Sequence, residues 1–364
     1  MKKILLIVTR LDVGGIENYL LRFLTYKNHN FEATVLSKSG QEGMLDSVYI
    51  SHNISIKQLK LSYFSLFDYL DLYKYIRCMK FDTVCDFTGD FSGIVLLIAR
   101  LAKIKKRLVF YRNSDYKFKK TVLRRIYARI VNLLTNGFAT KILSNSKAAL
   151  EKFHPHYKAK PQFFKVVDNG IPDYNKISTQ QYQMIRNGIG VPVDAFLIGH
   201  VGRYDVQKNH EQILSVAEQL IKKYDNVYFF LCGREVKDNL MSSLKQKNLD
   251  DRIIVDNTRN DVWHLLQSFN AFYYPSTIEG QPNALLEALS VGLPFVSSDI
   301  RAIKECVPEE FHKYLTSAND TDSAVELLST FIEQPAQDDF YIIQSYIKKR
   351  YDATTNFNKF LKEL

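Results

Sequence analysis

The chain has 364 residues, of which 46% are apolar and 24% charged, so its composition is that of a folded protein and its length that of two domains. Its formal net charge of +10 is unevenly divided. Residues 1–190 hold 31 basic and 14 acidic side chains, a balance of +17, whereas residues 191–364 hold 18 and 25, a balance of −7. Such a split indicates two halves with different surroundings.

The sequence argues against export and against a membrane span. The opening MKKILLIVTR has an apolar run too short for a signal peptide, and no stretch approaches 18 uninterrupted apolar residues. The four cysteines are scattered without CxxC spacing. We therefore expect a cytoplasmic protein without disulfides and without structural zinc.

Short apolar, β-branched runs alternate with amphipathic stretches along the whole chain, which predicts repeated βα units and parallel sheets. The expected strands are 3–9, 33–37, 54–59, 82–87, 107–111, 141–145 and 163–169, followed by 196–202, 226–233, 252–257, 271–276 and 293–299. Two consecutive series predict an α/β fold of two Rossmann-like, doubly wound domains. Ligands are then expected where the carboxyl ends of both sets of strands face a central cleft.

A polar segment with Gly and Pro punctuation separates the two series. We place the first domain at residues 1–175, a linker at 176–195 and the second domain at 196–340. We expect the remaining residues, 341–364, to form a basic helix that packs back on the first domain.

The first expected strand leads into TRLDVGGIENYL, which places Gly14 and Gly15 in a turn before a helix. Two glycines there allow a close approach to a ligand and leave helix amide groups pointing at it, as a phosphate or a sugar requires. The alternative is an ordinary strand-to-helix turn, because the pair is not a GxGxxG fingerprint.

A second candidate is HVGRYDVQKNH, in which a strand ends at Gly202 and is followed by Arg203 and Lys208. Both cations lie on the loop that enters the next helix, so they can converge on one diphosphate. A solvated basic loop is the alternative, although the surrounding half is acidic.

The segment PSTIEGQPNALLEALSVGLPFVSSD is the most informative. Glu279 follows a strand, Pro282 and Asn283 start a helix, and Glu287 is expected in the first turn of that helix. Two glutamates at this spacing are common by chance. Their combination with a helix N-terminus favours a polyhydroxylated, phosphorylated ligand.

With these motifs the chain resembles the retaining glycosyltransferases of family 4, which use nucleotide sugars and have the two-Rossmann GT-B fold. The matching segments are Gly14-Gly15, SNSKAAL (144–150), VDNGIP (167–172), VGRYDVQKN (201–209), LCG (231–233) and the Glu-x7-Glu block EGQPNALLEALSVGLP (279–294). The resemblance covers nearly the whole chain in the family's order.

The resemblance implies that the first domain binds the acceptor and the second binds the nucleotide sugar. Arg203 and Lys208 would then bind the diphosphate, and Glu279 would contact the donor sugar; these three are the implied catalytic residues. The implied nucleotide-sugar site comprises Gly14, Gly15, Gly202, Gly233, Gly280, Gln281, Pro282, Asn283, Ala284 and Glu287, with Glu287 on the ribose. No metal and no cofactor are expected, because cationic side chains and helix ends neutralise the diphosphate.

The chain departs from the family in two places. Arg112 and Asn113 stand near the position where members often carry a histidine beside the acceptor, and neither is a general base at neutral pH. The leaving phosphate would then take the acceptor's proton, and these residues would bind the acceptor or its phosphate. Glu235 and the pair Arg301-Ala302 replace family glycines around the nucleotide pocket, so the base is left open.

Residues 103–129 contain eleven basic side chains and one acid, interleaved with aromatic and aliphatic residues. A helix from about residue 117 with these residues would bind an anionic membrane surface in a salt-sensitive manner. The alternative is an ordinary amphipathic helix with its apolar face on the sheet. Nucleic acid is disfavoured because no binding motif is present.

The sequence thus predicts a glycosyltransferase that moves a sugar from a nucleotide diphosphate to a lipid-linked glycan in capsule, exopolysaccharide or lipopolysaccharide synthesis, peripheral on the inner face of the cytoplasmic membrane. Two alternatives remain open. One is a nucleotide-sugar epimerase or hydrolase of the same fold, and the other is a non-catalytic nucleotide-sugar-binding protein at the membrane.

Overall fold

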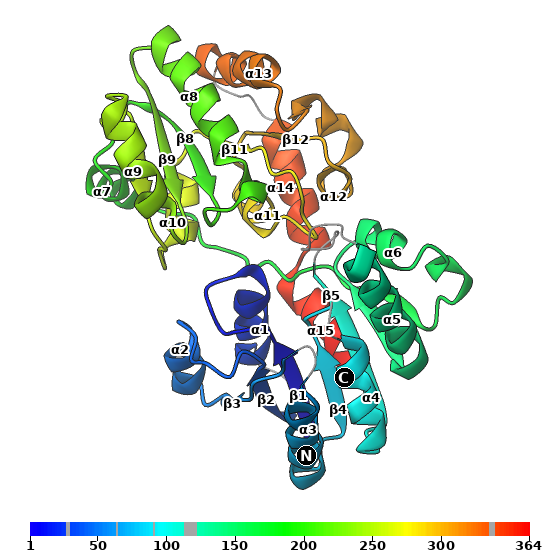
Figure 1. The fold of residues 1–364 in the computed structure, drawn as a ribbon. Coiled ribbons are helices and arrows are strands. Elements are labelled where there is room, and N and C mark those ends of the chain that lie inside the picture. Colours follow the sequence, from blue (N-terminus) through cyan, green and yellow to red (C-terminus); the bar gives the residue numbers. More distant parts are fainter. Residues whose placement is uncertain (27–29, 63–64, 90–91, 113–121, 335–338) are drawn as a thin grey trace. The chain divides into compact units, whose positions relative to one another are not determined.

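The computed structural model describes residues 1–26, 30–62, 65–89, 92–112, 122–334 and 339–364 (Figure 1). The chain forms two compact units: unit 1 comprises Met1–Gly170 and Thr354–Leu364, and unit 2 comprises Ile171–Ala353. Unit 2 thus begins earlier than the expected boundary after residue 175, and the segment expected as a linker, 176–195, contains a helix of unit 2. The reason is visible at Ile171, whose N–H donates to the Tyr351 carbonyl at 2.7 Å within the same unit.

Unit 1 is built on a parallel sheet with strand order β3-β2-β1-β4-β5-β6-β7. In its centre, Leu5 lies beside Thr34 on one side and Val84 on the other. The strands are β1 (Lys2–Val8), β2 (Phe31–Ser37), β3 (Ser55–Gln58), β4 (Thr83–Asp86), β5 (Lys106–Tyr111), β6 (Lys141–Ser144) and β7 (Phe164–Val166).

The helices of unit 1 cover both faces of this sheet. They are α1 (Gly15–Thr25), α2 (Asp46–Ser51), α3 (Leu66–Met79), α4 (Ser92–Leu101), α5 (Val122–Phe138), α6 (Lys147–Phe153), the short 3₁₀ turn η1 (Tyr157–Ala159) and α15 (Ala353–Glu363). Ser65 and Ser146 begin α3 and α6, since each hydroxyl accepts a backbone N–H three residues later. On one face α3 contacts α4, and α4 contacts α5.

On the other face, α15 closes the core of unit 1 with aromatic side chains. Phe360 lies 4.7 Å from Phe23 of α1 and 5.2 Å from Phe110 of β5, measured between ring centroids. At its end, Glu363 forms ion pairs with Lys141 and Lys165. The last residues of the chain are therefore an integral part of unit 1.

Unit 2 has a second parallel sheet with strand order β10-β9-β8-β11-β12-β13. The strands are β8 (Phe196–Val201), β9 (Val227–Cys232), β10 (Ile253–Asp256), β11 (Ala271–Tyr274), β12 (Phe295–Ser298) and β13 (Leu315–Thr316). Every strand expected from the sequence has an observed counterpart, and two parallel α/β sheets confirm the predicted fold class. Among the strands of the described residues, only β13 was not predicted, because two residues give no periodic signal.

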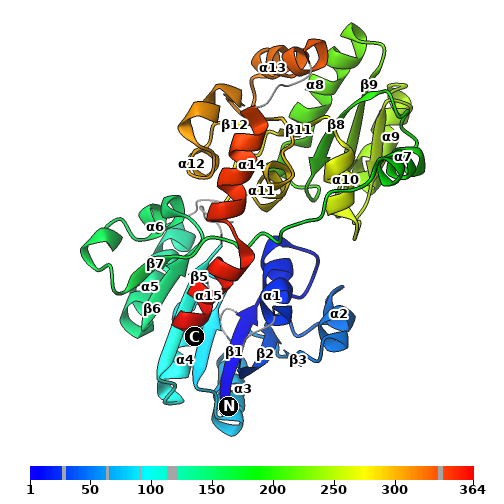
Figure 2. The same ribbon diagram turned by 180° about the vertical axis from the view of Figure 1, so that it is seen from behind.

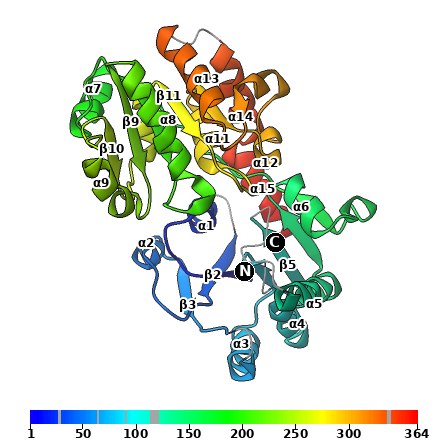
Figure 3. The same cartoon turned by 45° about the horizontal axis from the view of Figure 1, so that its top comes forward.

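The helices of unit 2 are α7 (Thr179–Gly188), α8 (His210–Lys223), α9 (Val236–Gln246), α10 (Val262–Ser268), α11 (Asn283–Ser290), α12 (Arg301–Lys304), α13 (Thr321–Glu333) and α14 (Asp339–Arg350), with 3₁₀ turns η2 (Val206–Lys208) and η3 (Glu309–Tyr314). α8 and α13 lie side by side (Figure 3), and α11 contacts α10 and α14 (Figure 2).

The expected C-terminal helix over 341–364 is wrong in one respect, because it is two helices that belong to different units. α14 packs in unit 2, while α15 packs in unit 1. Between them Tyr351 is fully buried and Asp352 pairs with Ile171 in an isolated bridge. This tertiary pairing interrupts the helix where the sequence has no Gly or Pro.

Candidate functional site

The strand order of unit 2 predicts where a ligand binds. From β8 the chain winds outward through β9 to β10, and it then returns to β11 on the other side of β8 before winding through β12. The connections after β8 and β11 therefore diverge at the carboxyl edge of the sheet, and such a switch point is the usual ligand crevice of a doubly wound fold. The loop 202–209 and the loop 275–282 both lie there.

Backbone hydrogen bonds fix these two loops and the turn after β9 to one another. Gly202 N–H donates to the Cys232 carbonyl at 2.9 Å, and Thr277 N–H donates to the Gln207 carbonyl at 2.8 Å. Asn209 adds a side-chain link, because its amide donates to the Pro275 carbonyl of the second loop at 3.4 Å. The loops thus form a preorganised surface.

Gly233 explains why a glycine follows β9. A Cβ atom at this position would lie 2.1 Å from the Gly202 carbonyl oxygen and 2.9 Å from the Arg203 nitrogen. No rotation of a side chain relieves a clash with backbone, so the ends of β8 and β9 can approach this closely only with glycine. The residue keeps the Arg203 loop in place.

Lys208, Glu279 and Tyr274 form the chemical centre of this edge. The Lys208 ammonium donates to a Glu279 carboxylate oxygen and to the Tyr274 hydroxyl, and the Tyr274 hydroxyl donates to the same carboxylate oxygen at 2.7 Å. The Lys208 and Glu279 side chains are 18% and 11% exposed. The structure therefore brings together two of the three predicted catalytic residues, with a tyrosine that was not predicted.

The electrostatics of this group keep the lysine charged. Burial acts to lower the pKa of Lys208, but the Glu279 carboxylate and Tyr274 outweigh it, so the pKa is raised above its ordinary value. Burial together with Glu279 raises the pKa of Tyr274, so its hydroxyl keeps its proton. The site thus offers a permanent cation and a neutral hydroxyl beside a carboxylate.

Arg203, the third predicted catalytic residue, lies on the same loop but pairs differently. Its guanidinium is 2.8 Å from the Asp205 carboxylate. Asp205 also begins the turn η2, since its carboxylate accepts the Gln207 N–H at 2.9 Å. A ligand phosphate would therefore compete with Asp205 for this arginine.

Glu235 occupies the place of the second family glycine after β9 and has a left-handed backbone with φ of 64°. That conformation explains the preference for glycine there. The exposed Glu235 side chain lies beside Arg234, whose Nε is 3.5 Å from the Glu235 carboxylate. The rim of the crevice therefore carries an ion pair that a glycine would not supply.

The helix α11 brings the rest of the predicted donor site to the same edge. It begins after Pro282, and its amide end follows the loop that carries Glu279. Gly280, Gln281 and Pro282 are buried and Asn283 and Ala284 are half-buried. Glu287 is 9% exposed and lies in the second turn of α11, so its expected place in the first turn was wrong. The positive end of the helix favours an anion at this loop.

Two histidines lie behind the Lys208 loop. His200 and His210 are buried with their rings 5.2 Å apart, and the His200 Nδ1 bonds to the Tyr273 carbonyl at 3.0 Å. Burial lowers the pKa of His210 to about 4 and that of His200 well below its ordinary value. Both rings are neutral near pH 7, so they add no charge next to Lys208.

The corresponding switch point of unit 1 lies between β1 and β4. Gly14 precedes α1 with extended backbone, and no side-chain cap is present at that N-terminus. This places Gly14 and Gly15 at the carboxyl edge of the sheet, as the sequence predicts.

Arg112 follows β5 at the same edge and is 7% exposed. Its guanidinium lies 3.8 Å from the Tyr19 ring centroid, and burial lowers its pKa to about 10, so it stays charged at neutral pH. Its Nη1 is buried without a hydrogen-bond partner among the described residues. Asn113, the other predicted acceptor residue, lies outside the described residues.

Asp86 is a candidate that the sequence analysis missed. It ends β4, is fully buried, and its Oδ1 accepts the Thr88 N–H at 2.6 Å. Burial raises the pKa of Asp86 and the nearby Lys38, itself buried, opposes this shift. The available signal was a carboxylate at the end of a strand beside the switch point.

The basic stretch 103–129 is not a uniform surface. Arg107 is 9% exposed and donates to the Phe138 carbonyl at 2.7 Å, so it holds β5 to the end of α5. Arg112 is buried as well, whereas Lys103, Lys105 and Arg129 are exposed. Side chains 113–125 lie outside the described residues.

Within the part of the chain that the structure describes, no three or more His, Cys, Asp and Glu side chains are arranged to hold a metal ion. No helix among the described residues combines the length and the apolar character needed to cross a membrane.

Comparison with known families assigns both halves of the chain. Residues 13–173 match the family model described as Glycosyltransferase Family 4, and residues 182–348 match the model described as Glycosyl transferases group 1. Together the two matches span the sheet of unit 2 and every strand of unit 1 except β1. The chain is a GT-B glycosyltransferase.

Three curated relatives of this glycosyltransferase are bacterial enzymes. It is 27% identical over 313 residues to the capsular polysaccharide biosynthesis glycosyltransferase CapH of Staphylococcus aureus, covering 84% of this chain and 83% of CapH. It is 24% identical over 345 residues to the N-acetylgalactosamine-N,N'-diacetylbacillosaminyl-diphospho-undecaprenol 4-alpha-N-acetylgalactosaminyltransferase of Campylobacter jejuni, covering 92% and 91%. It is 25% identical over 267 residues to the UDP-Gal:alpha-D-GlcNAc-diphosphoundecaprenol alpha-1,3-galactosyltransferase of Escherichia coli, covering 71% and 68%.

Solved structures show the same fold. The structure of Anabaena HepE in complex with UDP and glucose matches with a TM-score of 0.82 and 20% identity, over 100% of this chain and 99% of that chain. The structure of HepE with UDP-glucose also matches with a TM-score of 0.82, at 18% identity and over 100% of both chains.

Proposed function

We propose that this glycosyltransferase transfers a hexose-type sugar, with retention of anomeric configuration and without a metal, from a nucleoside diphosphate sugar to a lipid-linked glycan in cell-surface polysaccharide synthesis. The observation that carries the proposal is the hydrogen-bonded group of Lys208, Glu279 and Tyr274 at the switch point of unit 2. It supplies a charged cation, a carboxylate and the positive end of α11 within one edge, which suits a diphosphate attached to a sugar.

In this proposal Lys208 and Arg203 bind the diphosphate of the donor. Lys208 suits that role because its raised pKa keeps it charged at any physiological pH. Glu279 accepts hydrogen bonds from donor-sugar hydroxyls, and Glu287 accepts them from the ribose. The amide end of α11, from Gln281 to Ala284, adds stabilisation to the phosphate or the sugar. HepE, which has the same fold, is described in complex with UDP and glucose and with UDP-glucose, and this supports a nucleoside diphosphate sugar as the donor.

The transfer step breaks the bond between the anomeric carbon and the donor's terminal phosphate oxygen. The acceptor hydroxyl oxygen bonds to that carbon from the same face, and its proton passes to the leaving phosphate oxygen. Lys208 and Arg203 stabilise the negative charge that develops on the leaving diphosphate. Proton transfer to the leaving group requires no protein base, which agrees with Arg112 beside the acceptor edge.

The acceptor is proposed to be a sugar on a polyprenyl diphosphate. Two relatives are named for diphospho-undecaprenol acceptors, and the relative CapH is named for capsular polysaccharide biosynthesis. Arg112 of unit 1 is a proposed acceptor-side group. Residues 103–129 are proposed to face an anionic membrane on the cytoplasmic side, where such an acceptor resides.

The test is a transfer assay with radiolabelled UDP-hexoses and a short-chain polyprenyl diphosphate N-acetylhexosamine in detergent. We expect a lipid-linked disaccharide whose new linkage has the anomeric configuration of the donor by NMR, and unchanged turnover in EDTA. Glu279→Gln and Lys208→Met should each lower kcat/KM by about a hundredfold or more, since each removes a charge at the leaving diphosphate or sugar.

Lys223 and Glu333 provide matched control variants, because they form an exposed ion pair elsewhere in unit 2. Lys223→Met and Glu333→Gln should leave transfer unchanged. Free hexose or a C2 epimer formed without acceptor would instead identify a hydrolase or an epimerase. Donor binding without turnover across polyprenyl diphosphate acceptors would identify a non-catalytic binding protein.

A further inference from the structure

Unit 2 contains a cavity of about 810 Å³ at the amino edge of its sheet, the edge opposite the loops with Lys208 and Glu279. Its lining includes Phe196, which begins β8, and Asn270 and Pro294, which directly precede β11 and β12. Since β8 has six residues, about 20 Å separates this cavity from the start of the Lys208 loop. A cavity of this volume is large enough for a small-molecule ligand. We name it the amino-edge cavity.

A buried arginine fixes the orientation of the Asn270 amide in the lining. Asn270 Oδ1 accepts hydrogen bonds from Arg186 Nη2 at 2.6 Å and from the Leu197 N–H at 2.8 Å. Because both of these neighbours are donors, the oxygen of the amide and not its nitrogen must face them. Asn270 Nδ2 is therefore turned away from them, and it donates to no group among the described residues. The amino-edge cavity thus has one oriented donor available to a ligand.

The same arginine places a positive charge behind Asn270. Arg186 lies on α7 and is fully buried, and its other nitrogens donate to the carbonyls of Ser268, Pro192 and Ala195. All acceptors that it contacts within the described part of the chain are therefore neutral oxygens. A guanidinium is always charged in proteins, and a buried charge acts over a longer range than a solvated one. The arginine favours an anion next to Asn270.

The charged side chains in the lining itself are all cationic. Lys176 and Lys348 line the amino-edge cavity, and none of the described residues that line it is Asp or Glu. Lys348 forms an ion pair with the exposed Asp173 at 2.8 Å, and such a surface pair contributes little, so a ligand anion can replace it. The amino-edge cavity therefore selects a ligand with negative charge.

The remaining lining combines aromatic rings with an amide. Tyr182 of α7 and Tyr341 of α14 both line the amino-edge cavity. Gln344 of α14 donates its Nε2 to the Ser290 carbonyl at 3.1 Å, which orients its Oε1 as an acceptor. Tyrosine rings offer flat apolar faces on which the C–H face of a sugar ring can pack, and sugar hydroxyls both donate and accept hydrogen bonds. This lining suits a saccharide.

We infer that the amino-edge cavity binds an acidic saccharide, with a carboxylate of the sugar on Asn270 Nδ2 and the tyrosine rings against its apolar faces. The anion site follows from Asn270, Arg186 and the two lysines alone, whereas the choice of a saccharide rests on the proposed function. Such a site holds an acidic part of a glycan on unit 2, away from the edge where transfer is proposed. An acidic peptide is the alternative that the experiment must separate.

The experiment titrates the full chain with saccharides and follows the fluorescence of Trp263. This is the only tryptophan of the chain, and its ring stacks on that of Tyr174, which lines the amino-edge cavity. Hyaluronan tetrasaccharide and trigalacturonic acid are the acidic probes, maltotetraose is the neutral probe and tetraglutamate is the acidic peptide. At least one acidic saccharide should bind saturably, and at least about tenfold more tightly than maltotetraose and tetraglutamate.

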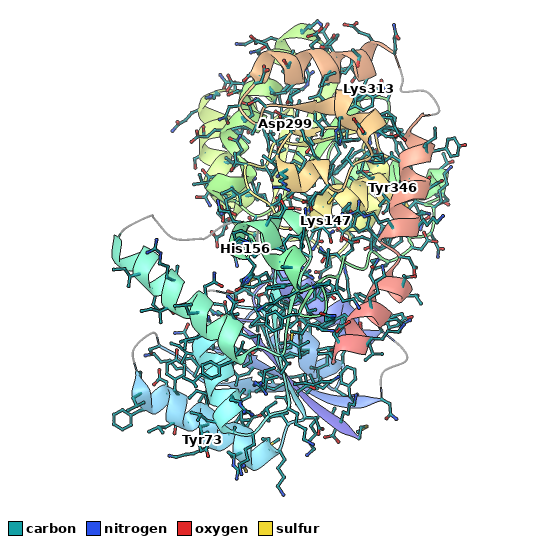
Figure 4. The ribbon with its side chains drawn as sticks, turned by 90° about the vertical axis from the view of Figure 1, so that its right-hand side faces the viewer. Tyr73, Lys147, His156, Asp299, Lys313 and Tyr346 are labelled. Carbon is teal, nitrogen blue, oxygen red and sulfur yellow. The ribbon has the colours of Figure 1, made fainter. Side chains whose placement is uncertain are left out.

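Asn270→Asp is the decisive variant, because its carboxylate still accepts from Arg186 and from the Leu197 N–H but no longer donates to a ligand. It should weaken binding of the acidic saccharide at least about tenfold. Tyr341, which is 64% exposed, gives a second variant, and Tyr341→Ala should weaken binding about threefold or more. Tyr346 lies on the same helix (Figure 4), is 37% exposed and does not line the cavity, so Tyr346→Ala should leave binding unchanged. Circular dichroism checks that each variant remains folded.

Binding of the acidic saccharide that is unchanged in Asn270→Asp and in Tyr341→Ala would overturn the inference. The same holds if neither acidic saccharide binds, or if tetraglutamate binds as tightly as they do. The proposed transfer reaction is tested separately, because Asn270→Asp should keep wild-type transfer and Lys208→Met should keep saccharide binding. A protein that binds the acidic saccharide through Asn270 but transfers no sugar would refute the proposed function and leave the anion site standing.

Discussion

The ion pair of Lys208 and Glu279 allows a quantitative test of the site that does not depend on the substrate. Replacing Glu279 by Gln removes the carboxylate and leaves the Lys208 ammonium, 18% exposed, beside the Tyr274 hydroxyl and 4.8 Å from the Tyr274 ring centroid. Breaking a buried pair typically costs 3–5 kcal/mol, because the remaining charge is desolvated without compensation. Since both side chains keep some exposure, we expect Glu279→Gln to lower the free energy of unfolding by about 3 kcal/mol.

Trp263 makes the measurement specific for unit 2. It is the only tryptophan of the chain and lies in α10, stacked on Tyr174 with the ring centroids 5.6 Å apart. Its fluorescence therefore follows the unfolding of unit 2. A loss of about 3 kcal/mol should lower the Tm of a unit of this size by about 6–12 °C.

A double-mutant cycle distinguishes loss of the pair from loss of two independent side chains. Lys208→Met/Glu279→Gln removes both charges. The free energy of unfolding of this double variant should therefore be higher, by about 2 kcal/mol or more, than the sum of the two single losses predicts. The exposed pair of Lys223 and Glu333, with 3.4 Å between Nζ and Oε1, is the control and should show a coupling of about 0.5 kcal/mol. Additive effects of Lys208→Met and Glu279→Gln would refute the coupling described for the site.

Three further changes give expected outcomes that can be measured by unfolding. Gly233→Ala should destabilise unit 2 by about 2–3 kcal/mol in Trp263 fluorescence, because its Cβ atom meets the Gly202 carbonyl, and wild-type stability would contradict this. Burial lowers the pKa of His154 to about 4, so the neutral folded ring stabilises unit 1 above about pH 6.5, and this contribution is lost as the pH falls toward 4. His154→Phe should remove this dependence of the free energy of unfolding on pH, measured by circular dichroism. An unchanged dependence would show that it does not come from His154. Burial raises the pKa of Asp86, so ionisation of its carboxyl lowers the free energy of unfolding as the pH rises above about 4. Asp86→Asn should therefore increase the free energy of unfolding more at pH 7 than at pH 4. An equal gain at both pH values would show that Asp86 titrates normally.

Much of the carboxyl edge of the unit 2 sheet was predictable, because parallel βα units place the ends of their strands at one edge. A motif that follows a strand, such as the loop with Lys208 or the loop with Glu279, is thereby assigned to that edge without knowledge of packing. The helix start was predictable to within one residue, because proline favours the first position of a helix and Pro282 directly precedes Asn283, where α11 begins.

The partners within the edge were not predictable. Tyr274 is one of two consecutive tyrosines that end β11, and only the strand register decides which side chain reaches Lys208. Asp86 looked like any strand-terminal acid, because its burial depends on the elements packed around β4. The break between α14 and α15 depends on the bridge of Asp352 with Ile171, which joins residues far apart in sequence.

The helix α5 shows the limit of pattern analysis most clearly. Its sequence VLRRIYARIVNLLTNGF carries aliphatic residues around most of the helix, and periodicity identifies which of them share a face but not which face is inward. Packing against α4 assigns the face of Val131 to the core and leaves that of Ile130 and Leu133 in solvent. Which aliphatic face of this helix is buried is therefore decided by its packing partner and not by the sequence pattern.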